Sequence, residues 1–225
     1  MNLRLTKILS ILAVALVLGW VGAISAQAEI IDFAGGSGGT LSYATTGGDL
    51  VGSGIPISSA QGTNVPLNNL VSLNSPDAVL SFTTGALTGT PAGSWSFGAG
   101  GAASITITGD LYNGPDIPAN LVASGTLMSG TVTDATVTST PEGLQFTISD
   151  FTDTKNADLL AFYGASGHWY GFLAMTSTGA ASSPGTFSVT PFSTDVANVP
   201  LPPSVLLLGS GLVCLLALGQ RNRKR

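Results

Sequence analysis

The stretch Leu144-Gln145-Phe146-Thr147-Ile148 alternates apolar and polar side chains, and this alternation decides the fold class. Successive side chains of a β-strand point to opposite faces, so such a segment offers one face to a core and one to water. The pattern recurs in short runs bounded by Gly, Pro, Asn and Asp, most clearly at 79–82, 95–97, 105–108 and 187–190. No segment between residues 29 and 195 shows a helical apolar period with caps. The sequence therefore predicts an all-β domain, an antiparallel β-sandwich or jelly roll.

The basic residues lie almost wholly at the two ends of the chain. Arg4 and Lys7 precede the domain, and four bases lie within 221–225, so that Lys155 is the only base among the twelve acids of the middle segment. That segment carries a net charge of −11. A surface with one base cannot neutralise a phosphate backbone, which excludes nucleic acid as a partner.

Residues 1–28 have the features of a secretory signal peptide. Arg4 and Lys7 supply a positive beginning, an apolar run follows from Ile8 to Ile24, and Ala26-Gln27-Ala28 gives small residues at both recognition positions of signal peptidase. We expect cleavage after Ala28 and export of the domain at 29–195. The alternative is an uncleaved signal anchor, which would export the same domain.

The C-terminus divides into a predicted stalk at 196–203, a transmembrane helix at 204–220 and a basic cytoplasmic tail at 221–225. The apolar run Val205–Gly219 would span only about 22 Å as a helix, short of the ~30 Å hydrocarbon core. Starting the helix at Val199 lengthens it to about 31 Å. The terminal bases should remain cytoplasmic, which puts the domain on the outer side of the inner membrane.

The motif Val199-Pro200-Leu201-Pro202, with Pro203 after it, precedes this Leu-rich span and the terminal Arg/Lys cluster. The three-part arrangement resembles a PEP-CTERM sorting signal of the VPLP type. The resemblance implies an exosortase-type processing enzyme as a partner, removal of the helix, and transfer to the cell surface or extracellular matrix. Leu201 stands where the commonest form of the motif has an acid, which leaves the exosortase subtype open. The alternative is a plain single-pass membrane anchor.

Catalytic signatures are missing from the middle segment. His168 is the only His and Cys214 the only Cys, and Cys214 falls in the predicted span, so neither a Cys/His nucleophile nor a Cys/His zinc site can form in the exported domain. Ser53 in Gly52-Ser53-Gly54 lacks the strand-to-helix context of a nucleophile elbow. We expect a protein that is not an enzyme and that binds no cofactor.

Two weaker binding hypotheses remain. Asp150, Asp153 and Asp158 form the densest polar cluster and could ligate Ca²⁺, although the preferred interpretation is a solvated turn in which Lys155 offsets part of the charge. Trp95, Trp169 and Tyr170 would form a carbohydrate-binding platform if they converged on one exposed face, although packing in the core is the preferred interpretation of these aromatic residues. The leading expectation is a bacterial cell-surface or matrix protein that contacts exopolysaccharide, with a carbohydrate-binding module as the first alternative.

Overall fold

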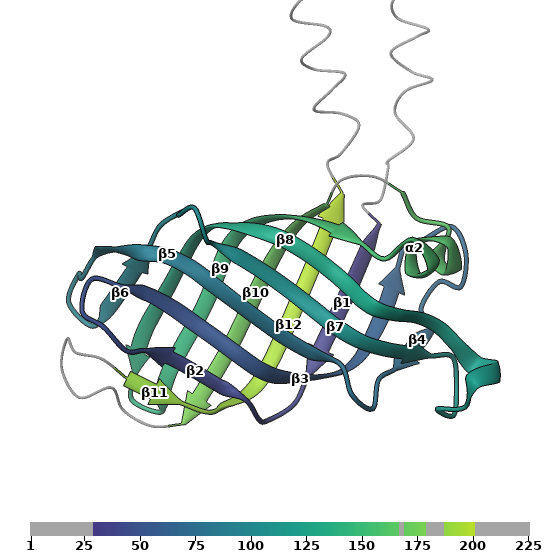
Figure 1. Cartoon of the computed structure of the whole chain (residues 1–225), viewed down its shortest axis with the longest axis horizontal. Helices are drawn as coiled ribbons and strands as arrows, with labels where there is room; N and C mark the ends of the chain where they lie inside the picture. Colours follow the sequence, from purple (N-terminus) through teal and green to yellow (C-terminus); the bar gives the residue numbers. More distant parts are fainter. Residues whose placement is uncertain (1–28, 167–168, 179–186, 201–225) are drawn as a thin grey trace, which may run out of the picture. The chain divides into compact units, whose positions relative to one another are not determined.

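The computed structural model describes residues 29–166, 169–178 and 187–200, which form an all-β domain with one short α-helix (Figure 1). The strand pairings are antiparallel, so the predicted all-β, antiparallel class is confirmed. The strands are β1 (Ile30–Gly35), β2 (Thr40–Tyr43), β3 (Asp49–Thr63), β4 (Ser72–Asn74), β5 (Val79–Gly89), β6 (Ser94–Phe97), β7 (Ser104–Tyr112), β8 (Leu121–Thr140), β9 (Gly143–Lys155), β10 (Trp169–Thr178), β11 (Phe187–Val189) and β12 (Pro191–Pro200). A 3-10 turn, Pro118–Asn120, precedes β8, and the helix α2 covers Ala157–Tyr163.

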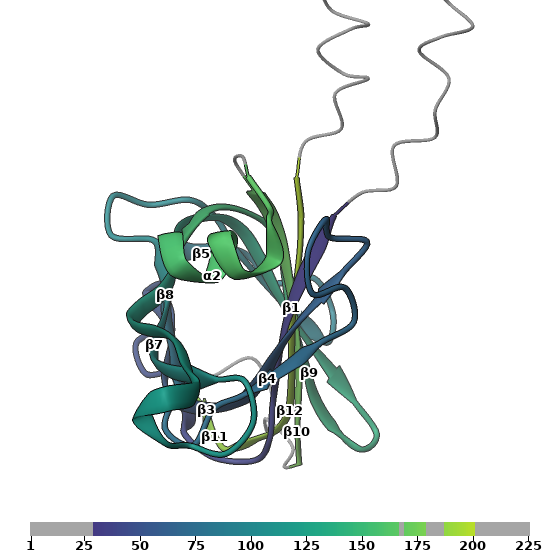
Figure 2. The same ribbon diagram turned by 90° about the vertical axis from the view of Figure 1, so that its right-hand side faces the viewer.

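One continuous sheet contains all of these strands, and it closes on itself. Eight strands follow one another around a ring in the order β1, β12, β10, β9, β8, β7, β5, β3, and β3 then pairs back onto β1. The closing pair runs from Ile30 opposite Thr63 to Gly35 opposite Ile57. The shorter strands β2, β4, β6 and β11 extend this ring. Figure 2 shows the strands arranged around a common axis.

The sandwich expectation placed the core between two separate sheets. Facing walls do enclose the core here, but continuous hydrogen bonding joins the walls into a single sheet. Strand alternation predicts a buried face in either arrangement, and it carries no information on whether the first and last strands pair.

Apolar side chains fill the interior at alternate positions along each strand. On β10, Trp169, Leu173 and Met175 are buried, whereas Tyr170 and Phe172 between them are exposed. Aromatic rings from different strands meet inside: the Phe82 and Phe146 rings stack with centroids 5.1 Å apart. An eight-stranded ring is just wide enough for its own side chains, so this interior forms the core.

The predicted stalk at 196–203 is wrong where the structure describes it. Val196 is fully buried, and residues through Pro200 pair with β10 as the last part of β12. Proline is tolerated here because it stands at the end of the strand, where fewer backbone N–H groups are needed for the ladder. The sheet therefore continues five residues past the predicted domain end at 195. The helix start at Val199, which lengthened the predicted membrane span to about 31 Å, is wrong as well, because Val199 and Pro200 lie in β12.

The apolar run Leu159–Tyr163 is a weaker strand candidate by its sequence, and that prediction is wrong, because these residues lie in the helix α2, whose seven residues are too few to show a helical period. Its ends are nevertheless well defined: the Asn156 side chain accepts from the backbone N–H groups of Asp158 and Leu159, and Gly164 ends the helix in the left-handed conformation. The Tyr163 hydroxyl lies 3.1 Å from the Ala60 carbonyl oxygen and 2.9 Å from that of Val71, which fixes α2 against β3 and the segment after it.

In the part of the chain that the structure describes, no helix has the length and apolar character needed to cross a membrane. The two apolar segments predicted within 1–28 and 204–220 lie outside the described residues.

We predict that Gly171→Ala destabilises the domain, because a Cβ at this position would lie 1.9 Å from the Phe151 ring in the core. Overpacking of this kind should lower the free energy of unfolding by about 3 kcal/mol, measured by urea unfolding. The control is Gly101→Ala, whose added Cβ meets no atom within 4 Å. Equal unfolding midpoints for the two variants would contradict the close packing of Phe151 on β10.

Candidate functional site

The most polar part of the core is an ion pair at the end of β9. Lys155 Nζ lies 2.5 Å from Asp153 Oδ2, and both side chains are inaccessible to solvent. The ammonium also lies 4.6 Å from the centre of the Trp169 ring on β10, a distance suited to a cation–π interaction. The one base of residues 29–200 is therefore inside the sheet.

Strand alternation accounts for the position of this pair. Phe151, Asp153 and Lys155 occupy alternate positions of β9 and are all buried, whereas Thr152 and Thr154 between them are exposed. Across the ladder, Asp153 lies opposite Gly130 of β8 and Trp169 of β10. A Cβ on Gly130 would lie 3.0 Å from the Asp153 side chain and 2.3 Å from the Thr152 carbonyl oxygen. Only glycine therefore fits next to Asp153 at this position of β8.

Burial and attraction act in opposite directions on the two charges. Loss of solvation raises the pKa of Asp153 and lowers that of Lys155, while the pairing favours the charged form of each. With both effects included, the pKa of Lys155 is lowered to about 8. The contact between the two groups is short enough for the attraction to keep both charged at neutral pH. The pair thus remains ionic at the cost of desolvation.

A second carboxylate, Asp32 on β1, is only partly satisfied. Its Oδ1 atom is buried without a hydrogen-bond partner among the described residues. The pKa of Asp32 is raised to about 6, because burial and, to a lesser extent, the Asp195 carboxylate raise it more than Lys155 lowers it. Asp32 therefore titrates in a mildly acidic range where an ordinary aspartate is fully ionised.

Two surface hollows border the same strands. One, of about 360 Å³, is lined by Ser129, Gly130, Thr131, Thr152, Asp153 and Thr154. The other, of about 400 Å³, lies at the β8–β9 turn and is lined by residues 140–145 and 176–178. Each is lined by a single acidic residue, Asp153 or Glu142, so neither brings two ionisable side chains together for acid–base chemistry.

The three carboxylates of the calcium hypothesis do not converge. Asp153 points into the core and pairs with Lys155, Asp150 is exposed on the same strand, and Asp158 lies exposed in the first turn of α2. Within the described residues, no group of three potential ligands is close enough to hold a metal ion. That hypothesis is wrong because odd and even positions of a strand face opposite sides of the sheet.

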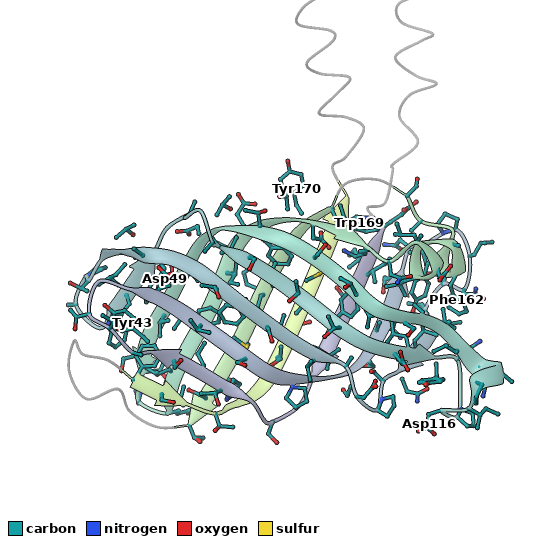
Figure 3. The ribbon with its side chains drawn as sticks, in the orientation of Figure 1. Tyr43, Asp49, Asp116, Phe162, Trp169 and Tyr170 are labelled. Atoms are coloured by element: carbon teal, nitrogen blue, oxygen red, sulfur yellow. The ribbon has the colours of Figure 1, made fainter. Side chains whose placement is uncertain are left out.

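The three aromatic residues of the carbohydrate hypothesis are separated as well. Trp95 and Trp169 are buried in the core, and only Tyr170 is exposed, pointing away from the sheet (Figure 3). A platform of these residues is therefore ruled out. His168 lies outside the described residues.

The sorting motif begins inside the sheet. Val199 lies opposite Tyr170, and Pro200 lies opposite Trp169, as the last two residues of β12. Leu201, Pro202 and Pro203 lie outside the described residues, as do Ala26 and Ala28. At the N-terminal end of the domain, β1 begins at Ile30, two residues after the predicted cleavage site.

The buried ion pair was not predicted, although the sequence contains a signal for it. In Phe151-Thr152-Asp153-Thr154-Lys155, both charged residues share the alternate positions of a core phenylalanine. This register puts them on the buried face and makes the domain's one base the natural partner of Asp153.

We predict that Asp32→Asn removes a pH dependence of stability. The folded-state pKa of Asp32 is raised from 3.8 to about 6, so the folded protein binds its proton more tightly, and stability falls as pH rises between these values. The variant should lack this fall and be more stable at pH 7 by about 1–2 kcal/mol, after allowance for partial solvent screening. Thermal unfolding from pH 4 to 7 measures this; parallel curves for variant and wild type would contradict it.

We also predict that Asp153→Asn costs about 3–5 kcal/mol, because it leaves the Lys155 ammonium buried without its countercharge. Replacing both residues, as Asp153→Leu with Lys155→Met, should restore most of the loss, since a buried apolar pair needs no solvation. Urea unfolding gives both values. Asp150→Asn on the exposed face of β9 is the control and should change stability by less than about 0.5 kcal/mol. A double variant as unstable as the single one would contradict the ion-pair explanation.

Comparison with protein-family models, with curated proteins and with solved structures gave no match to this chain. Its function is therefore inferred from its own residues.

Proposed function

We propose that the chain is an exported, non-enzymatic surface or matrix protein, held in the inner membrane by its C-terminal segment and then released by an exosortase-type enzyme. The observation that carries this proposal is the position of the three-part tail, whose motif begins with Val199 and Pro200, the last two residues of β12 in a closed sheet.

The boundary between sheet and tail supports removal of the tail. The ring takes its last residues from β12, which ends at Pro200 between β1 and β10. A cut after Pro200 would therefore remove no strand from the described sheet. A cut before Val196 would remove the β12 residue that faces Phe33 and Leu173, and would open the core.

Surface charge supports a neutral matrix as the destination. The one base of residues 29–200 is buried, so the exposed surface of the described domain carries carboxylates without a compensating cation. Such a surface repels acidic polymers and is compatible with an uncharged exopolysaccharide. Signal peptidase, the inner membrane and the processing enzyme are the other partners in this proposal.

Intact-mass measurement on the chain isolated from the cell envelope tests the proposal. We expect a mature chain that begins at Glu29 and lacks Arg225, with its new C-terminus beyond Pro200. Pro202→Ala, within the motif, should leave the tail attached. Pro118→Ala is the matched control, because Pro118 is an exposed proline in the turn before β8, outside the motif. The Pro118→Ala chain should lose its tail as the wild type does.

An envelope-bound wild-type chain that retains Arg225 would contradict processing and assign the tail to a permanent anchor. A chain that retains residues 1–28 would contradict cleavage of the signal peptide while leaving export intact.

A further inference from the structure

Four exposed apolar side chains lie at the end of the ring where the chain enters and leaves the sheet, two in the loop after β3 and two on β10, with β1 and β12 between the two pairs. They are Leu67, Leu70, Tyr170 and Phe172, between 40% and 61% exposed, and together they form what we call the exit rim. The described residues contain seven exposed large hydrophobic side chains, so this end holds more than half of them. Isolated exposed apolar residues are ordinary, but a concentration of them marks a contact surface.

Strand register brings these residues to the same end of the ring. The first residue of β1, Ile30, lies opposite Thr63, the last residue of β3, and the last residue of β12, Pro200, lies opposite Trp169. Tyr170 and Phe172 follow Trp169 on β10, opposite Val199 and Ala197. Figure 1 shows β1 and β12 side by side at this point, and Figure 3 shows Tyr170 projecting there.

The two leucines belong to the loop that follows β3. The Leu70 N–H donates to the Gly62 carbonyl oxygen (2.8 Å), and Gly62 itself lies opposite Ile31 of β1. The Leu67 N–H donates to the Tyr163 carbonyl oxygen (2.9 Å). These bonds tie the loop to α2 and to the end of β3, which pairs with the beginning of β1.

Three residues of this loop have a left-handed backbone conformation. Asn64, Asn68 and Leu70 have φ angles of 57°, 49° and 62°. Asparagine tolerates this left-handed region, but leucine is rarely found there. Strain of this kind persists only where surrounding contacts impose it, and it is a reason to look for a function. The Asn68 side chain supplies one such contact by donating to the Phe162 carbonyl oxygen (2.7 Å).

The rim is close, along the chain, to the predicted membrane segment. The apolar run starts at Val205, five residues after Pro200, and an extended chain of that length reaches at most about 18 Å. Tyr170, opposite Val199, therefore stays near the membrane surface for as long as the tail is inserted.

The charge of the exposed surface limits how the domain can contact lipid. The exposed surface of the described domain has no base with which to bind anionic headgroups, and Asp158 of α2 is exposed near this end. Attachment must then use apolar side chains and tyrosine, which suit the boundary between headgroups and acyl chains.

We propose that the exit rim rests on the lipid headgroup region of the membrane while the C-terminal segment is inserted. The contact would orient the ring with β1, β10 and β12 toward the bilayer and present the VPLP segment at the membrane surface. This inference rests on the proposed function, because it requires an inserted tail.

The full chain reconstituted in phosphatidylcholine vesicles tests the contact. Single variants Tyr170→Trp, Phe172→Trp and Leu67→Trp place a fluorophore on the rim, and nitroxide-labelled lipids quench fluorophores near the headgroups. Val51→Trp is the matched control: Val51 is also exposed, but it lies twelve residues from Thr63 on β3, about 40 Å along the strand. Relative to the wild-type background, rim tryptophans should lose at least about twice as much fluorescence as the control.

Three outcomes decide the matter. Preferential quenching at two or more rim positions supports the contact, and the use of three positions guards against one variant that misfolds. Chains that float with the vesicles but show equal quenching at the rim and at Val51→Trp overturn it, as does a rim that crosslinks to a second copy without quenching. Chains that do not float contradict the inserted tail, and with it both the proposed function and the rim contact.

Discussion

The pairing of β1 with both β3 and β12 is the constraint on which the rest of this structure depends. It joins the first strand to the third and to the last, so that the sheet has no free edge along the ring. Closure sets the size of the interior, and therefore which side chains are buried. It also requires residues 196–200 as part of a strand, which is why the segment before the tail is paired instead of exposed.

Closure also explains why a charged pair can exist inside so apolar a domain. Asp153 and Lys155 face the interior because they share a register with Phe151, and the ring leaves them no route to solvent. The two groups then satisfy each other, with the Trp169 ring against the ammonium. The consequence reaches the surface: with its one base buried, the described domain exposes acids and uncharged side chains but no Lys or Arg.

The proposed function and the exit rim both follow from where the chain leaves the ring. Because β1 and β12 are antiparallel neighbours, the beginning and the end of the domain lie at one place. Exposed apolar side chains and a strained loop lie at that same place. A domain that is complete at Pro200 can lose its tail without losing a strand, which suits a protein that is held at a membrane only for a time.

The sequence by itself determined the all-β class, because period-two alternation is a local property of each strand. It also located the charge at the chain ends and the motif at Val199–Pro202, since these are read directly from residue order. The divergence of Asp150 and Asp153 follows from the same alternation once both residues lie in one strand. Only the tertiary structure decided that the strands close into one sheet and that this sheet includes residues up to Pro200. The physical reason is that closure depends on pairing between strands distant in sequence, which no local pattern encodes.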